Sequence, residues 1–152
     1  MKRILLFMAA AAAAIAVVPF QAGAAGPPPR FELSPASLSF SASAGNFDYH
    51  SVTVTNNRGP LVIQNPASSD DGHFFDTQAG TCWQTYEVFG DPIPAHTSCS
   101  IQVGFTSATA GTFTGTLTVY RCLTWTYAGP TNSIICTSTD GGETVDLIGI
   151  AM

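Results

Sequence analysis

Short runs in which polar and apolar residues alternate recur along the chain after residue 30, and turn residues separate them. Alternation with a period of two predicts strands that have one buried face and one solvated face. The predicted strands span residues 37–41, 51–55, 61–63, 73–75, 100–105, 112–120 and 144–150. About seven short strands, with no convincing amphipathic helix, predict an all-β, immunoglobulin-like β-sandwich.

The apolar members of these runs form the predicted core of the sandwich. They are Leu38, Phe40, Val52, Val54, Ile101, Val103, Phe105, Phe113, Leu117 and Val119. Between two of the strands, the segment 56–59 reads Asn-Asn-Arg-Gly. Asn and Gly tolerate the backbone conformations of tight turns, so we expect a turn there.

A different pattern opens the chain. Lys2 and Arg3 precede an uninterrupted apolar run over residues 4–18, which is followed by a proline and by small residues. This pattern predicts a signal peptide over residues 1–25, because the run is shorter than the roughly 20 residues of a spanning helix. Residues 26–32 then form an extended Pro-rich leader and residues 33–152 the domain. We therefore expect a secreted or periplasmic protein that does not insert into a membrane after cleavage.

Removal of residues 1–25 leaves three arginines and no lysine against ten carboxylates, a formal net charge of −7. A nucleic-acid-binding domain carries a basic surface that neutralises phosphates. We therefore expect no nucleic-acid partner.

Candidate catalytic and metal-binding residues are few and scattered. His50, His73 and His96 lie in separate predicted elements, whereas a metal site needs several ligands that converge. The acidic turn at residues 70–72 has only Asp76 near it, which is too few oxygens for calcium. No nucleophile elbow and no glycine-rich phosphate loop occur. We expect no enzymatic activity and no cofactor, and a small metal-dependent or hydrolytic enzyme is the least favoured alternative.

The chain has four cysteines, which in an exported protein predict two disulfides. They are Cys82, Cys99, Cys122 and Cys136. Three connectivities are possible. No C-x-x-C spacing is present, so neither a structural zinc site nor a thioredoxin-like pair is indicated.

Residues 121–137 read RCLTWTYAGPTNSIICT and predict a hairpin centred on Gly129. Pairing about that centre places three pairs opposite each other: Leu123–Ile135, Trp125–Ser133 and Tyr127–Thr131. Alternation puts Leu123, Trp125 and Tyr127 on one side. Two interpretations stay open, namely that the aromatic residues cap the end of the sandwich, or that they form a contact surface for a partner.

The order of several segments resembles a known family. These segments are 33–40, 52–63, 98–105 and 110–119. Together they resemble the ASPM/SPD-2/Hydin (ASH) family of immunoglobulin-like domains, whose bacterial versions are often described as choice-of-anchor D modules. The resemblance covers about residues 33–150 and implies a non-catalytic interaction or spacer module.

The resemblance also bears on the disulfides. In family members that carry the cysteines matching Cys82 and Cys99, the two pair, which implies the same pair here. Both Cys82–Cys99 and Cys122–Cys136 are sequence-local choices, so we expect these two disulfides, the second closing the hairpin.

Three features depart from the family pattern. The usual proline after the strand that ends at Phe105 is absent, and the segment 83–96 is longer than typical. The residues after Val119, which hold Cys122 and Cys136, are an insertion. The hairpin is therefore an addition to a common frame.

These observations predict a secreted, non-catalytic binding or structural module that acts through surface contacts with an unidentified protein or glycan at the cell envelope. The alternative is a subunit of a surface appendage or envelope layer, assembled by pairing of edge strands.

Overall fold

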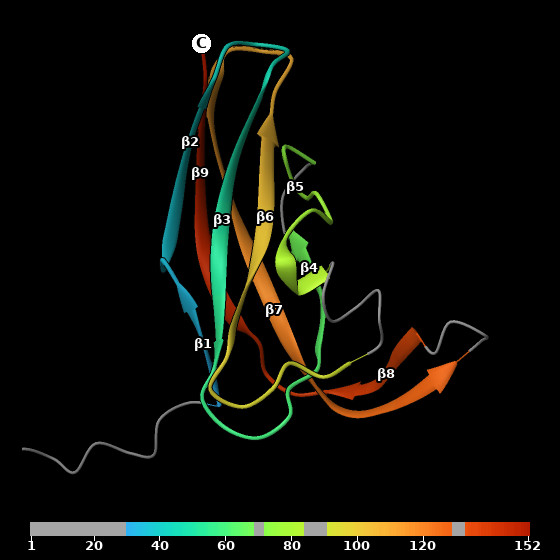
Figure 1. Ribbon diagram of the computed structural model, residues 1–152. Coiled ribbons are helices and arrows are strands. Elements are labelled where there is room, and N and C mark those ends of the chain that lie inside the picture. Colours follow the sequence, from blue (N-terminus) through green and yellow to red (C-terminus); the bar gives the residue numbers. More distant parts are fainter. Residues whose placement is uncertain (1–29, 69–71, 84–90, 129–132) are drawn as a thin grey trace, which may run out of the picture.

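The computed structural model describes residues 30–68, 72–83, 91–128 and 133–152, and nine strands lie within them (Figure 1). The strands are β1 (Phe31–Ser34), β2 (Ser37–Ala42), β3 (Phe47–Asn56), β4 (Ile63–Ser68), β5 (Phe74–Asp76), β6 (Ser98–Thr106), β7 (Gly111–Ala128), β8 (Ser133–Thr139) and β9 (Glu143–Ala151).

The strands form two sheets that pack face to face as a sandwich (Figure 1). The four-stranded sheet has the order β1-β3-β6-β5, and the five-stranded sheet has the order β2-β9-β7-β4, with β8 paired to β7 outside this path. The predicted all-β, immunoglobulin-like sandwich is confirmed. Two strands exceed the expected seven: β1 was not among the predicted runs, and β8 is the returning strand of the predicted extra hairpin.

The chain changes sheets between β1 and β2. β1 pairs antiparallel with β3, whereas β2 pairs parallel with the last strand, β9. Phe31 is buried in the core and pairs with Asn56, although the sequence had placed it in the leader. β1 therefore begins two residues before the predicted domain boundary at residue 33. Residues 1–29 lie outside the described residues.

The bounds of several strands differ from the predicted ones, including those of β3 and β4. β3 begins at Phe47, four residues before the predicted start at residue 51. β4 runs over residues 63–68 and passes through Pro66, where the sequence had predicted the strand to stop. A proline fits here because β4 is an edge strand and its ladder to β7 shifts between Gln64 and Ala67.

The core lies between the sheets. Nine of the ten predicted core residues are buried there, and Phe113 is the exception, since it is half-buried against the rim of the core. The core also contains residues that alternation had not selected, namely Phe31, Ala42, Leu61, Ile63, Phe74, Cys82, Ile93, Cys99, Val145, Leu147 and Ala151. Leu61 and Ile93 reach the core from connections between strands, held by a single antiparallel bridge.

Asn56, the last residue of β3, is fully buried and is the centre of a polar cluster at one end of the sandwich. Its Nδ2 donates to the carbonyl oxygens of Gly59, Ile93 and Pro94, at 2.7, 2.9 and 2.9 Å. Its Oδ1 accepts from the Arg58 N–H at 3.1 Å. The predicted turn over residues 56–59 is thus built around the side chain of its first residue.

Replacing Asn56 tests this cluster. In Asn56→Ala the buried carbonyl oxygens lose their donor, so we expect the free energy of unfolding to fall by about 3 kcal/mol. Asn56→Asp keeps the acceptor for Arg58 but places a second oxygen among the carbonyls, and it should cost at least as much at neutral pH. Urea unfolding of both variants measures the effect, and a near-native Asn56→Asp would contradict the donor role.

Gly149 and Gly104 provide a matched pair of glycine-to-alanine tests. A Cβ on Gly149 would lie 2.2 Å from the ring of Phe105, which is fully buried and has no space to move. A Cβ on Gly104 would lie 2.5 Å from the end of the Phe75 ring, which is only half-buried. We expect Gly149→Ala to cost about 1–3 kcal/mol, and Gly104→Ala less than about 1 kcal/mol. Equal losses in thermal unfolding would contradict this account.

Candidate functional site

The second half of β7 and the strand β8 form a hairpin that leaves the sandwich, which we call the arm (residues 122–139). In Figure 1 the arm projects sideways from one end of the sandwich, beyond the edge of the sheets. Within β7, Gly111 to Val119 pair with β9, Tyr120 and Arg121 pair with β4, and Cys122 to Ala128 pair with β8. The predicted hairpin is therefore present, with bounds shifted from 121–137.

The register of the arm corrects the predicted pairing. The observed pairs are Cys122↔Thr139, Thr124↔Ser138, Trp125↔Cys136, Thr126↔Ile135, Tyr127↔Ile134 and Ala128↔Ser133. The prediction counted equal numbers of residues inward from the two cysteines. The ladder instead shifts on both sides of Thr124, so Cys136 pairs with Trp125 and not with Cys122. Gly129, the predicted centre of the turn, lies outside the described residues.

A disulfide and several polar contacts hold the root of the arm. Cys122 is bonded to Cys136, with the two Cα atoms 5.6 Å apart, and the Cys122 N–H donates to the Val62 carbonyl at 2.8 Å. Arg121 forms an ion pair with Asp140, and the Asp140 N–H donates to the Arg121 carbonyl at 3.1 Å. The arm is therefore attached to the edge of the sandwich by side-chain and main-chain contacts at the same place.

One face of the arm is apolar. Trp125 and Tyr127 project to the same side, and their cross-strand partners Cys136 and Ile134 share that side, since directly opposite residues of a ladder lie on one face. Leu123 and Tyr127 are 47% and 57% exposed, and Trp125 is half-buried.

The core cluster, and the hydrophobic side chains that pack against it, include none of Leu123, Trp125 and Tyr127. This geometry does not support the interpretation that the aromatic residues cap the core. The apolar face stands apart from the sandwich.

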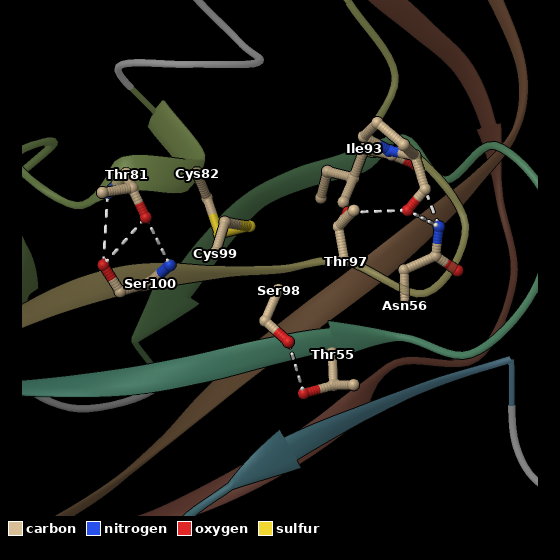
Figure 2. Close-up of a disulfide and its surroundings, with 10 residues drawn as sticks. Thr55, Asn56, Thr81, Cys82, Ile93, Thr97, Ser98, Cys99 and Ser100 are labelled. Carbon is tan, nitrogen blue, oxygen red and sulfur yellow. Dashed lines mark hydrogen bonds between the residues drawn. A yellow bond between two sulfur atoms is a disulfide. The ribbon is translucent and has the colours of Figure 1, made fainter.

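The second disulfide, Cys82–Cys99, lies inside the domain (Figure 2). It attaches the segment after β5 to the central strand β6, and both of its cysteines are buried in the core. Beside it, Thr81 and Ser100 are joined by three contacts: the two hydroxyls are 3.1 Å apart, the Ser100 N–H donates to Thr81 Oγ1, and the Thr81 N–H donates to Ser100 Oγ. This disulfide therefore stabilises the fold, since both of its cysteines are buried.

The three histidines lie on separate elements. His50 Nε2 is 3.3 Å from Asp48 Oδ2 on the same strand, His73 Nδ1 is 3.1 Å from the Thr106 carbonyl oxygen, and His96 lies in a turn where its N–H donates to Asn56. Within the described residues, no group of three or more His, Cys, Asp or Glu could hold a metal ion. Asp70 and Asp71 of the acidic turn lie outside those residues.

Sequence reasoning missed a second exposed cluster, on the outer face of the four-stranded sheet. Phe47 and Tyr49 of β3 and Phe75 of β5 lie together there, with ring centroids 6.1 to 6.5 Å apart. Phe47 and Tyr49 are 56% and 48% exposed. The alternation Phe47-x-Tyr49-x-Ser51 was a usable signal, but the predicted strand began at residue 51.

Two carboxyl groups in the sandwich have shifted pKa values. Burial acts to raise the pKa of Asp48, but N–H donors from Ser41 and Tyr49 and the nearby His50 outweigh it and hold the pKa below 3.8. Burial raises the pKa of Asp76 above 3.8, and the hydrogen bond from Gln78 N–H only partly offsets it.

Comparisons with known proteins give similarity of fold alone. No protein-family model matches the chain, and no curated protein matches it. The VesB protease of Vibrio cholerae has a TM-score of 0.51 at 11% identity, over 80% of this chain and 32% of that one. The seventh PapD-like domain of human CEP192, an ASH/PapD-like domain, also has a TM-score of 0.51 at 11% identity, over 81% of this chain and 85% of the domain.

The chain thus spans about a third of the VesB structure and most of the CEP192 domain. It has the fold of ASH/PapD-like, immunoglobulin-like domains. Among the described residues, no helix is long and apolar enough to cross a membrane.

The two shifted carboxyl groups predict opposite effects of pH. The folded chain binds the Asp76 proton more tightly than the unfolded chain does, so the ionised group destabilises the fold at neutral pH. Asp76→Asn should therefore be more stable than the parent at pH 7, and the difference should vanish as the pH falls below the usual Asp range. Asp48 stabilises the fold when ionised, so Asp48→Asn should be less stable at pH 7 and approach the parent on acidification.

Urea unfolding of the parent and both variants between neutral and acidic pH measures these differences, and each variant is a control for the other. Differences of the same sign in the two variants would contradict the assignments.

Proposed function

We propose that this chain is a secreted, non-catalytic binding module that contacts a protein partner at the cell envelope through the apolar face of the arm. The contact residues are Leu123, Trp125 and Tyr127. The observation that carries this proposal is that these side chains lie on a disulfide-closed hairpin and outside the core, where they contribute little to the stability of the sandwich.

The chemistry of this face favours a protein partner. It combines aromatic rings with the aliphatic side chain of Ile134, and the exposed Leu123 precedes them on the same strand. Buried aromatic side chains contribute much of the binding energy in protein interfaces. The disulfide and the hydroxyl contact between Thr124 and Thr137, at 2.7 Å, restrict the hairpin before binding. A restricted surface loses less conformational entropy when a partner binds.

Other features support the remaining parts of the proposal. The predicted signal peptide and two disulfides support export, because disulfides persist in oxidising compartments. The ASH/PapD-like fold supports a module without catalysis, and the order of the sequence segments supports the bacterial choice-of-anchor D type. The arm then provides the binding specificity that distinguishes this protein from other domains of the same fold.

A second candidate function is self-assembly by strand pairing. Among the described residues, β8 pairs on one side only, so its seven-residue outer edge is available to another strand. The edges of the four-stranded sheet are less suited to this, because β1 and β5 have only four and three residues. If this candidate is correct, the chain forms oligomers without any partner.

The double variant Leu123→Ser/Tyr127→Ser tests the arm. Residues 26–152 would be used as bait for the envelope fraction of the host, followed by affinity measurement with the purified partner. We expect the double variant to bind at least about tenfold more weakly, because two exposed anchors are lost. Its melting temperature should stay within a few degrees of the parent, since both side chains are exposed.

Phe47→Ser/Tyr49→Ser is the matched control, with two side chains of similar exposure on another surface. Equal loss of binding in the control would contradict a role for the arm. Concentration-dependent oligomers in sedimentation velocity that survive the arm variant would favour strand pairing instead.

A further inference from the structure

The outer face of the four-stranded sheet has a second exposed surface, which we call the platform (Phe47, Tyr49 and Phe75). β3, β6 and β5 lie side by side in this sheet (Figure 1). Tyr49 and Phe75 are both paired with Gly104 of β6, one from each side. The ring of Phe75 lies over Gly104, since a Cβ there would meet the ring at 2.5 Å. The missing side chain of Gly104 lets Phe75 reach the rings of β3.

The geometry of the rings is specific. Phe47 and Tyr49 are nearly parallel, with 9° between their planes, and Phe75 is nearly perpendicular to both, at 89° and 90°. Coverage of a strand glycine by an aromatic ring stabilises a sheet and accounts for Phe75. It does not account for Phe47 and Tyr49, which leave about half of their surface exposed and are not part of the core.

Uncharged polar side chains continue the platform along the same face. The other outward positions of β3 and β6 are Ser51, Thr53, Thr55, Ser98, Ser100, Gln102 and Thr106. None of the outward positions on β3, β6 and β5 has a formal charge, although the chain as a whole carries −5. None is aliphatic either, which distinguishes this face from the arm.

Gln102, next to the rings, is held in one orientation. The Thr77 hydroxyl lies 2.9 Å from Gln102 Oε1 and 3.2 Å from the Gln102 carbonyl oxygen. The side-chain oxygen of Gln102 is therefore engaged, and its Nε2 makes no hydrogen bond within the described residues. Since an amide nitrogen has two donor hydrogens, Gln102 can donate to a ligand that lies on the platform.

We propose that the platform binds a neutral glycan. A sugar ring has an apolar C–H face, which is attracted to the negative face of an aromatic ring, and a rim of hydroxyl groups that need donors and acceptors. Tyr49 and Phe47 supply the aromatic surface, and Gln102 and Ser51 supply the adjacent polar groups. The outward positions of β3, β6 and β5 carry no charge, which matches an uncharged ligand, and the only charge that β1 adds to this face is the carboxylate of Glu32, which offers no cation to a polyanion. This inference does not depend on the arm, which uses different residues on a different sheet.

The test is a titration of ¹⁵N-labelled residues 26–152 with cellohexaose, chitohexaose, maltohexaose and xylohexaose, followed by two-dimensional NMR. We expect at least one of these neutral probes to shift the amide resonances of Gly104 and Gln102 at millimolar concentration. Tyr49→Ala should weaken that binding about tenfold, because a stacking contact is lost. Tyr127→Ala, which removes an aromatic residue of similar exposure from the arm, should leave it unchanged.

Several outcomes would overturn the proposal. One is that none of the four neutral probes shifts these amides, and another is that heparin, a polyanion, shifts them more strongly than any neutral probe. A third is that the same resonances change with protein concentration alone, which would mean that a second copy covers the platform. Thermal unfolding of Tyr49→Ala is the control: a melting temperature close to that of the parent shows that the variant is folded, so that any loss of binding comes from the lost contact.

Discussion

The buried amide of Asn56 holds together the three segments that meet at one end of the sandwich. These are the end of β3, the turn over residues 57–60, and the connection over residues 93–97 that leads into β6. Hydrogen bonds of this kind are strong in a buried environment, and each partner left alone there is costly. The position where β6 enters the sheet, opposite the end of β3, is therefore held by this side chain together with the backbone hydrogen bonds that join Asn56 to His96 and Thr97.

The register set at that end extends along the whole sheet. β3 and β6 pair without a shift from Thr55↔Ser98 to Phe47↔Thr106. A slip of one residue would exchange the two faces, since side chains alternate along a strand. The same register thus buries Val52, Val103 and Phe105 in the core and places the platform outside. The Cys82–Cys99 disulfide adds a covalent link to β6 near its start.

The other sheet supports a surface of a different kind. β7 is long enough to be a core strand for its first half and one side of the arm for its second half. The arm therefore has a rigid attachment, although its apolar face does not touch the core. The sandwich supplies a frame, and its two sheets present surfaces of different composition: aliphatic and aromatic on the arm, aromatic and hydroxyl-bearing on the platform.

The sequence by itself determined the fold class and most of the core, because a period of two in burial is local information. It also predicted that Leu123, Trp125 and Tyr127 share a side. The structure keeps Trp125 and Tyr127 on one face, whereas the ladder shifts between Cys122 and Thr124, at Leu123. The tertiary structure decided the pairing partners, such as the parallel contact of β2 with β9, and the irregular register of the arm. It also placed Phe75 over Gly104 beside Tyr49, and it buried Asn56. These features join residues that are far apart in the chain. They depend on how neighbouring strands pair and pack, and a local sequence pattern holds no information about that pairing.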